Sequence, residues 1–347
     1  MARLPKLTAA LLLSVMVNSC SPANPYESLS NLTPERSLSA EPLRTTALPL
    51  HRDLSTVRSV GQLGYLGGLV LQSGDRRFGG LSSLLVSADG REFLAVSDRG
   101  FWVVATLDYR NGQLSGAHDL RISPILDPEG QPLITSKRWG SDAEALTEIP
   151  GGLIVAFEGQ HRLWQYNATF GDVMEQKAAH PLPLPANIAT AIAALPGNGG
   201  LESLTRLKDG RLFAIAEEGG PEAGITPAWI LDGDRSLSLF YQTGNNFKPT
   251  DLATLPNGDL LVLERRFTLL QGVAARVKYI AATDLKPGAT VRGRELAMLS
   301  YPYHVDNMEG IAVREGPAGE IFVYLVSDDN YHPLQNTLLM MFQLNEP

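Results

Sequence analysis

Cysteine is almost absent from this sequence, because Cys20 is the only one in 347 residues. The chain can therefore form no internal disulfide, and a structural zinc site, which needs several Cys or His ligands, is not expected. Charged residues make up 19% of the chain and the formal net charge is −8, with no stripe of Lys and Arg. This pattern does not indicate nucleic-acid binding, although a local cationic pocket for a small anionic ligand is compatible with it.

Several common catalytic signatures are also missing. The sequence contains no G-x-S-x-G, no G-x-x-x-x-G-K-[ST], no G-x-G-x-x-G between a strand and a helix, and no H-E-x-x-H. These absences argue against an α/β-hydrolase serine esterase, a P-loop NTPase, a dinucleotide-binding domain and a zinc metalloprotease. Apolar residues make up 44% of the chain, which is a globular composition, and 33 Gly with 23 Pro are typical of a turn-rich fold.

The first twenty residues have the pattern of a targeting segment. Arg3 and Lys6 precede an apolar run over residues 7–17, which is shorter than the roughly 20 residues that cross a bilayer. The run is followed by "VNSC", so residues 1–20 resemble a bacterial lipoprotein signal, with lipidation at Cys20 after cleavage. An ordinary secretory signal is the alternative. Both predict an exported protein, and the first predicts one that is lipid-anchored to the cell envelope, with its membrane contact through Cys20.

The chain after this segment divides by composition. Residues 21–50 are rich in Ser, Pro, Thr and Leu without a period, which predicts a flexible tether. The remaining residues, 51–347, are expected to form the folded domain.

A unit of strand, Gly-containing turn and second strand recurs along this domain. Each copy opens on a small or polar residue, continues into an apolar run and closes on acids. The copies occupy residues 79–100, 141–160, 199–218, 248–266 and 307–330. Their apolar anchor positions are Leu84, Leu146, Leu204, Leu252 and Ile311.

Because the anchors recur about every 50 to 60 residues, the repeat predicts an all-β fold, a β-propeller with five recognisable four-stranded blades. A degenerate sixth blade, a β-sandwich and a two-domain all-β protein are the alternatives. We expect the C-terminal strand "TLLMMFQL" to pair with an N-terminal strand near "GQLGYLGGLVLQ" and so to close the ring.

Acidic residues recur at two positions of the unit, which we call the first and second columns. The first column holds Glu144, Glu202 and Glu309, with Asp251 one place off and Ser82 in the first copy. The second column holds Asp98, Glu158, Glu217 or Glu218, Glu264, and Asp328 with Asp329. In a propeller, equivalent positions face the same end of the central channel, so we expect the columns to form rings there. Crowded carboxylates repel one another unless a cation neutralises them, and oxygen ligands in this number suit Ca²⁺. Taken singly, each acid could simply solvate a turn.

Basic residues and two histidines lie between the acids. The basic residues are Arg99, Arg162, Lys248, Arg265 and Arg266; cations beside a metal can bind phosphate oxygens, although each could instead be the charge partner of a neighbouring acid. His304 and His332 flank the last copy, and one of them could protonate a leaving alcohol, although a lone histidine is often a bystander.

Taken together, "GGLSSL…LAVSDRG", "SDAEAL…VAFEGQHRLWQY", "GGLESLTRLKDGRLFAIAEE", "KPTDLATLPNGDLLVLERR" and "DNMEGIAV…LVSDDN" resemble the phytase-like family of bacterial proteins, described as having esterase-like activity of phytase. The resemblance runs from about residue 61 to residue 344 and implies a β-propeller. It also implies Ca²⁺ as cofactor and a small anionic, phosphorylated substrate. The metal-binding or water-activating candidates that it implies are Asp98, Glu144, Glu202, Glu309 and Asp328. Among these, Glu202 and Glu309, with His304, are the catalytic candidates, and Arg99, Lys248 and Arg265 are the implied phosphate-binding residues.

Three functions therefore stay open at this point. The first is an exported metal-dependent phosphoester hydrolase, and the second is a non-catalytic binding or scaffold propeller of the envelope. The third is a Ca²⁺-dependent lactonase or carboxylesterase, which would need one metal in a more apolar pocket with histidine as base.

Overall fold

The computed structural model describes residues 42–135, 139–244 and 246–345. The chain divides into two units, Met1–Arg36 and Ser37–Pro347, and all of the described residues belong to the second. The predicted signal peptide, Cys20 and most of the predicted tether therefore lie outside the described residues. Within the described ranges, no helix has the length and apolarity that a membrane crossing requires.

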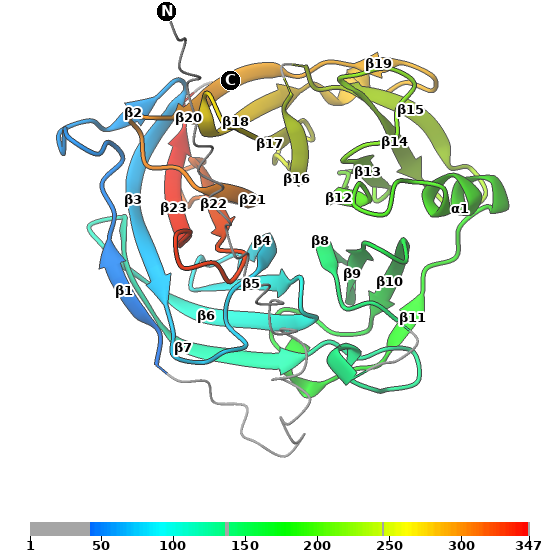
Figure 1. Cartoon of the computed structure of the whole chain (residues 1–347), viewed down its shortest axis with the longest axis horizontal. Helices are drawn as coiled ribbons and strands as arrows, with labels where there is room; N and C mark the ends of the chain where they lie inside the picture. The colour runs from blue at the N-terminus through cyan, green and yellow to red at the C-terminus, as the bar shows by residue number, and fades with distance from the viewer. Residues whose placement is uncertain (1–41, 136–138, 245, 346–347) are drawn as a thin grey trace, which may run out of the picture. The chain divides into compact units, whose positions relative to one another are not determined.

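Short apolar runs separated by glycine turns form five sheets arranged around a central axis (Figure 1). This confirms the predicted five-bladed β-propeller, and the described residues contain no sixth blade. The innermost strand of each blade contacts its neighbours around the ring. These inner strands are β4 (Leu81–Val86), β8 (Ala143–Ile149), β12 (Leu201–Arg206), β16 (Lys248–Thr254) and β21 (Asn307–Glu315).

The other strands follow the inner ones outward in each blade. Blade 1 adds β5 (Glu92–Ser97), β6 (Phe101–Arg110) and β7 (Gln113–Pro124). Blade 2 adds β9 (Gly152–Phe157), β10 (Arg162–Tyr166) and β11 (Ala179–Pro181). Blade 3 adds β13 (Leu212–Ala216), β14 (Ile225–Leu231), β15 (Leu237–Gln242) and a short parallel strand, β19 (Thr290–Val291). Blade 4 adds β17 (Leu260–Thr268), β18 (Gly272–Ile280) and β20 (Arg294–Ser300). Blade 5 adds β22 (Ile321–Asp328), β23 (Thr337–Leu344), β3 (Leu63–Gln72), β1 (Arg44–Ala47) and β2 (Ser59–Val60).

The two ends of the described chain close the ring in blade 5. Strand β23 pairs antiparallel with β3, from Thr337 opposite Leu71 to Leu344 opposite Leu63, as the sequence predicts. Strand β1 covers the outer edge of β3. The folded domain therefore begins inside the stretch that the sequence predicts as tether, because the open edge of β3 offers residues 44–47 backbone partners.

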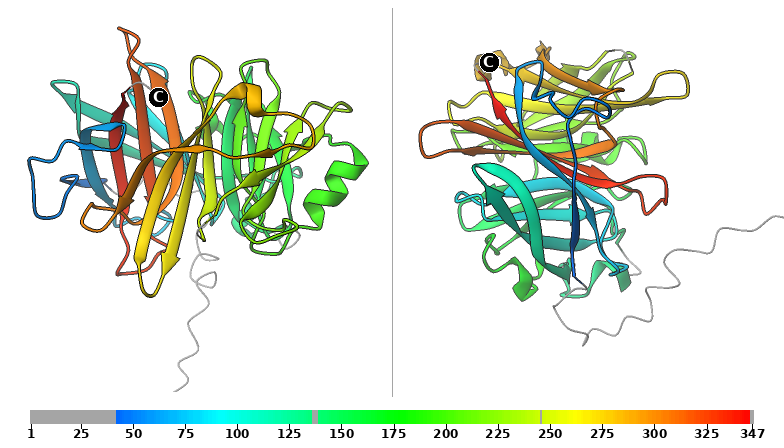
Figure 2. Two further views of the ribbon diagram at one scale, coloured as in Figure 1. Left: turned by 90° about the horizontal axis from the view of Figure 1, so that it is seen from above. Right: turned by 90° about the vertical axis from the view of Figure 1, so that its left-hand side faces the viewer.

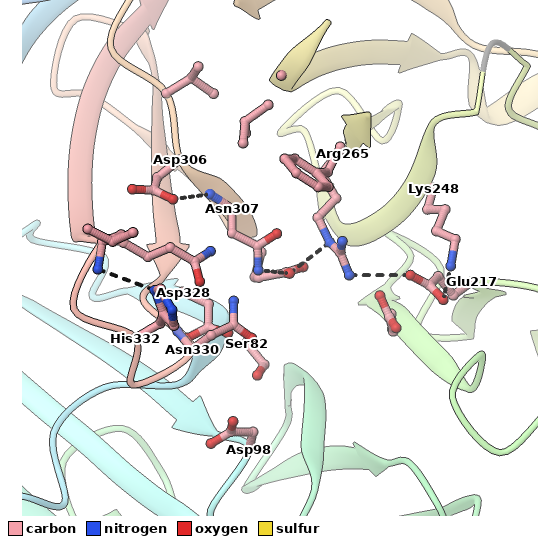
Figure 3. A pocket seen from close by; sticks show the side chains of 18 of the residues that line it. Ser82, Asp98, Glu217, Lys248, Arg265, Asp306, Asn307, Asp328, Asn330 and His332 are labelled. Carbon is pink, nitrogen blue, oxygen red and sulfur yellow. Dashed lines mark hydrogen bonds and ion pairs between the residues drawn. The ribbon is translucent and has the colours of Figure 1, made fainter. Parts of the chain in front are cut away.

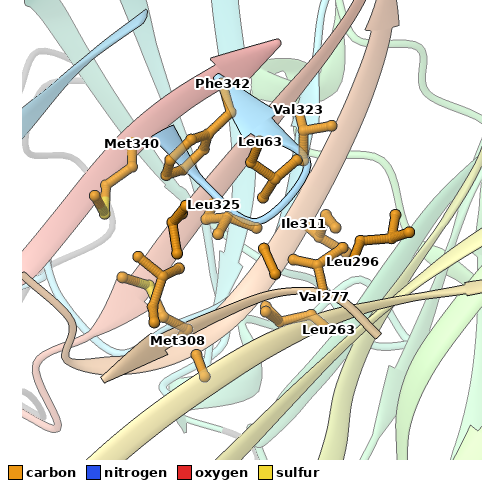
Figure 4. Packing of buried hydrophobic residues seen from close by; sticks show 14 of the residues in the cluster. Leu63, Leu263, Val277, Leu296, Met308, Ile311, Val323, Leu325, Met340 and Phe342 are labelled. Atoms are coloured by element: carbon orange, nitrogen blue, oxygen red, sulfur yellow. The ribbon is translucent and has the colours of Figure 1, made fainter. Parts of the chain in front are cut away.

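Apolar cores fill the spaces between neighbouring blades. Figure 4 shows the one between blades 4 and 5, where Leu263 and Val277 meet Ile311 and Phe342. All five anchor positions are buried, with at most 4% of the side chain exposed. Each such burial stabilises the fold by roughly 1.5–3 kcal/mol, so the repeated anchors hold adjacent blades together.

Helical structure is limited to short connections. Helix α1 (Ala186–Ala193) contributes Ile188 and Ile192 to the apolar core between blades 2 and 3. Three 3₁₀ turns complete the described elements, η1 (Leu133–Thr135), η2 (Val173–Glu175) and η3 (Ala282–Asp284).

Candidate functional site

Every inner strand carries an irregularity at the same place, near its first residues. In each blade the pairing between the first two strands skips one residue of the inner strand. The skipped residues are Ser82, Glu144, Glu202, Thr250 and Glu309. A bulge of this kind leaves one residue without a ladder partner and re-aims its side chain. The predicted first column is thus a structural column, and Thr250 rather than Asp251 occupies it in blade 4.

Asp251 instead occupies the next position and forms a buried junction between blades. Its carboxylate accepts hydrogen bonds from the backbone N–H of Ile311 at 2.9 Å and from Ser83 Oγ at 3.0 Å. The backbone N–H of Leu252 donates a third at 2.8 Å. These bonds tie the inner strands of blades 4, 5 and 1 together below the column of bulges, so the role of Asp251 is structural.

The second column is set by the residues opposite the start of each inner strand. It consists of Asp98, Glu158, Glu217, Arg265 and Asp328, each three residues after the partner of an anchor residue. In blade 4 the column residue is therefore Arg265, and the prediction of Glu264 is wrong. The error comes from the alternation of a strand, because one residue moves the side chain to the other face.

Glu264 points between blades 3 and 4 and is fully buried. It forms an ion pair with Arg276, a second with Lys278 Nζ at 3.2 Å, and it accepts a hydrogen bond from Tyr241 Oη at 2.6 Å. These neighbours compensate the buried charge of Glu264, so it needs no ligand.

Both columns open into one cavity of about 1030 Å³ at the end of the central channel (Figure 3). The predicted residues that line it are Asp98, Glu144, Glu202, Lys248, Arg265, Glu309 and Asp328. The structure thus brings together residues that lie as far apart in the sequence as Asp98 and Asp328.

The acids of blades 1 and 2 form the most crowded part of this cavity. Oxygen atoms of Asp142, Glu144 and Glu158 lie within 4.8 Å of one another. Burial, and then the charges of Asp142 and Glu202, raise the pKa of Glu144 well above its usual value. Burial also raises the pKa of both Asp142 and Glu158. This group of oxygens is costly to ionise unless a cation joins it.

Asp98 extends the acidic group from blade 1. Burial, followed by the charges of Asp328 and Asp142, raises the pKa of Asp98 well above its usual value. Its Oδ1 atom is buried and has no hydrogen-bond partner among the described residues. A buried carboxylate oxygen without a partner is rare in proteins and indicates a group that a ligand completes.

Two cations face the acids from blade 4. Lys248 Nζ lies 2.8 Å from Glu217 Oε2 and 2.5 Å from Glu218 Oε1. Arg265 Nε lies 2.8 Å from Glu309 Oε1, and its Nη2 lies 3.4 Å from Glu217 Oε1. Nη1 of Arg265 takes no part in these pairs. The cavity therefore has an acidic side and a side where positive and negative charges alternate.

Glu309 and Asp328 connect the two sides. Burial raises the pKa of Glu309 to about 8 even though Arg265 acts to lower it. Burial likewise raises the pKa of Asp328 to about 7. Asn307 Nδ2 donates a hydrogen bond to Glu309 Oε1 at 2.6 Å, which holds this carboxylate toward Arg265 (Figure 3).

Two of the predicted site residues do not line the cavity. Arg99 follows Asp98 but is not among the lining residues, and its guanidinium carbon lies 3.1 Å from the ring centre of Tyr331. His304 Nδ1 lies 2.8 Å from the carbonyl oxygen of Pro49. The other candidate histidine, His332, does line the cavity.

Asp142 is the main site residue that the sequence predictions omit. It lies just before β8 and two residues before the bulged Glu144, and its carbonyl oxygen accepts a hydrogen bond from the N–H of Glu158. The signal available in the sequence was a second acid beside Glu144 in "SDAEAL".

The fold and the site define a five-bladed β-propeller with an acidic cavity at one end of its channel. A family model, described as "Esterase-like activity of phytase", matches residues 76–331. The chain therefore belongs to the phytase-like family.

Several solved structures are similar to this chain over most of its length but share little sequence with it. An α-L-arabinofuranosidase from Podospora anserina has 13% identity and a TM-score of 0.47, covering 83% of this chain and 98% of its own. A PQQ-bound aldose sugar dehydrogenase from Streptomyces coelicolor has 12% identity and a TM-score of 0.41, covering 88% and 100%. A glutaminyl cyclase from Myxococcus xanthus has 11% identity and a TM-score of 0.39, covering 89% and 100%. No curated protein matches the sequence.

Proposed function

We propose that this chain is an exported, metal-dependent hydrolase of phosphoesters, with Ca²⁺ as the expected metal. The main support for the proposal is that a group of carboxylates and a pair of cations face each other in one cavity. Crowded carboxylates lie on blades 1 and 2, and Arg265 and Lys248 face them from blade 4. Membership of the phytase-like family supports the same activity.

The donor set fits a hard divalent cation. Asp98, Asp142, Glu144 and Glu158 offer carboxylate oxygens only, and Ca²⁺ takes about six to eight oxygen ligands in irregular geometry. The unpartnered Oδ1 of Asp98 is the atom that most needs such a partner. A cation held there would neutralise the carboxylates and act as a Lewis acid toward a phosphoryl oxygen and water.

Arg265 and Lys248 would orient the phosphate. Arg265 is held from two sides by Glu309 and Glu217, so its guanidinium is fixed in direction before a ligand binds. Its Nη1 atom can donate to a phosphate oxygen without breaking either ion pair. A preorganised donor of this kind stabilises charge that develops in the transition state.

Two buried carboxyls can carry protons. Burial and the charges of Glu217 and Glu309 raise the pKa of Glu202 well above its usual value, which makes its carboxylate a stronger base toward water. Glu309, with its pKa near 8, can hold a proton at neutral pH and deliver it to a leaving alkoxide. This assigns to Glu309 the proton-donating role that the sequence also allows for His304.

Turnover under controlled metal conditions tests the proposal. We expect p-nitrophenyl phosphate or phytate to be hydrolysed with Ca²⁺ and to survive with a chelator, whereas p-nitrophenyl acetate is hydrolysed slowly or not at all. Glu144→Gln should raise the Ca²⁺ concentration needed for half-maximal activity, and Glu202→Gln should lower kcat by about a hundredfold or more. Asp209→Asn, a change at an exposed acid of a turn outside the cavity, should leave both values nearly unchanged.

The same assay distinguishes the two other functions. Hydrolysis of the acetate alone would favour a lactonase or carboxylesterase. Tight Ca²⁺ binding without turnover of any ester would favour a binding or scaffold propeller, and either result would refute the proposed hydrolase.

We propose further that Cys20 is lipidated and holds the protein at the bacterial cell envelope, on the periplasmic or outer-membrane face. The support is the sequence alone, with its positive start, its short apolar run and its lone cysteine. Incorporation of labelled palmitate into the wild-type chain and its loss in Cys20→Ser would agree with this. Equal labelling of both would contradict it.

A further inference from the structure

The rim of the cavity on the side of blades 4 and 5 carries large apolar side chains among polar ones such as Gln271 and Gln335. The described residues include six large apolar side chains that are exposed, which are Leu54, Phe267, Leu269, Leu270, Tyr301 and Leu334. Phe267, Tyr301 and Leu334 line the candidate cavity, with 64%, 77% and 84% of their surface exposed. Single exposed apolar residues are ordinary, but a cluster at the opening of a polar cavity marks an interaction site.

The hairpin of β17 and β18 shows how the apolar rim adjoins the cationic group. Arg265 and Phe267 are two residues apart on β17 and so face the same side. Val273 lies opposite Phe267 in the pairing of the two strands, and all three residues line the cavity. Figure 2 shows this hairpin projecting beyond the neighbouring strands. A ligand held by Arg265 therefore has an apolar wall directly outside its anionic group.

Two further segments complete the wall from the direction of blade 5. The connection from β20 to β21 supplies Tyr301, Tyr303 and Val305, and the connection from β22 to β23 supplies Leu334. Polar residues such as Asn307 and Glu309 lie deeper, and Glu309 is buried whereas the apolar side chains are largely exposed. On this side of the cavity, the apolar side chains thus lie near the opening and these polar ones lie deeper.

The acids proposed to bind the metal and the apolar wall belong to different parts of the ring, whereas the lining acids Glu309 and Asp328 belong to blade 5 itself. Blades 1 to 3 supply Asp98, Glu144 and Glu202, whereas the large apolar lining residues come from blades 4 and 5 and their connections. An inositol phosphate, which is polar on every side, would leave this wall in water. A ligand with one anionic end and one hydrocarbon end would match both regions.

We propose that the ligand of this cavity is an amphiphilic phosphoester, with its phosphate at Arg265 and its hydrocarbon arm along the wall of Phe267, Tyr301 and Leu334. This inference rests on the proposed phosphoester chemistry and names its substrate class. The wall is open to solvent on one side, so it would cover about half of each methylene group of the arm. The arm then contributes to affinity in proportion to its length.

Binding of two phosphate monoesters to the full chain in Ca²⁺ tests the proposal, with isothermal titration as the readout. Hexyl phosphate, kept below its micelle concentration, has five methylene groups more than methyl phosphate. Half-burial of each lowers Kd about twofold, so we expect hexyl phosphate to bind about 30-fold more tightly. Phe267→Ser and Leu334→Ser should each reduce this ratio to below about tenfold while leaving the Kd of methyl phosphate within about twofold.

Leu270→Ser is the matched control. Leu270 lies at the tip of the same hairpin and is 98% exposed, but it does not line the cavity. We expect this variant to keep the full 30-fold ratio. Because all three positions are exposed, the substitutions should not unfold the domain, and thermal melting checks this.

The outcomes separate this inference from the function on which it rests. Equal Kd values for the two esters would overturn the amphiphilic substrate and leave the phosphoester proposal standing. A ratio that Leu270→Ser lowers as much as Phe267→Ser would overturn the assigned wall. Failure of both esters to bind would overturn the inference and the proposed function together.

Discussion

The buried carboxyls of the cavity make the stability of the metal-free protein depend on pH in an unusual direction. Folding raises the pKa of Glu309 from 4.5 to about 8 and that of Asp328 from 3.8 to about 7, in both cases through burial. Between the unfolded and the folded pKa values, the folded state binds more protons than the unfolded state. The free energy of unfolding must therefore fall as the pH rises through this window.

The size of the effect follows from the shifts. Each group changes by about three units, and one unit corresponds to about 1.36 kcal/mol, so one group alone costs about 4 kcal/mol when ionised. The two groups share Arg265, so we take about 4 kcal/mol as the combined loss between pH 5 and pH 9. For a domain of this size, that lowers Tm by roughly 8 °C.

Calcium should offset part of the loss, because its binding to Asp142, Glu144 and Glu158 stabilises the folded state. Saturating the folded state at 100 times Kd adds about 2.7 kcal/mol. Burial raises the pKa of these three acids too, so protons compete with Ca²⁺ at pH 5 and the gain there should be small. The measurement is a set of melting curves at pH 5, 7 and 9, each with chelator and with Ca²⁺.

Two variants show whether the named groups are responsible. Combining Glu309→Gln with Asp328→Asn should reduce the pH dependence of the chelated protein, whereas Glu218→Gln should leave it unchanged. Part of the dependence should persist in the double variant, because burial also raises the pKa of Asp98, Glu144 and Glu202. A metal-free Tm that is constant or rises from pH 5 to pH 9, together with an equal Ca²⁺ effect at both ends, would refute the reasoning.

Three further predictions test the assignments around the site. Glu264→Gln leaves two buried cations without their partner and should lower the free energy of unfolding by about 3–5 kcal/mol, whereas the exposed Glu218→Gln should cost less than about 1 kcal/mol in the same urea titration. Asp251→Ala removes the acceptor of two buried N–H groups and should cost about 3 kcal/mol; a change below 1 kcal/mol would show that the blades do not depend on this junction. Arg99→Gln should leave KM for a phosphoester within about threefold, whereas Arg265→Gln should raise it more than tenfold, and equal effects would contradict the placement of Arg99 outside the cavity.

The fold was predictable because its signal is repeated. Apolar anchors such as Leu84 and Leu204, each followed by a glycine turn and a second apolar run, specify a strand pair, and five such pairs specify a ring. The bulged first column was predictable for the same reason. Each of its residues lies two positions before an anchor, and this spacing does not vary.

The second column was harder to predict because the turns differ in length. Leu252 and Arg265 are separated by a shorter turn than Ile311 and Asp328. Counting from the anchor therefore gives no fixed position, and the acid Glu264 lies one residue before the column residue Arg265. In a strand, a shift of one residue turns the side chain from the central channel to the space between blades.

Blade 4 departs from the repeat, and this makes the distribution of charge around the cavity asymmetric. If every blade carried acids at these positions, the ring would be symmetrical, and its charge could be balanced only by several cations. In blade 4, Thr250 replaces the first-column acid and Arg265 replaces the second-column acid, while Lys248 lies opposite Arg265. The same strand that supplies Arg265 continues into Phe267 and the apolar rim. Blade 4 thus supplies both the positive charge that could orient an anionic group and part of the apolar surface proposed for the rest of the ligand. In the proposed function, the repeated acids would hold the cation, and the residues that break the repeat would select the substrate that lies against it.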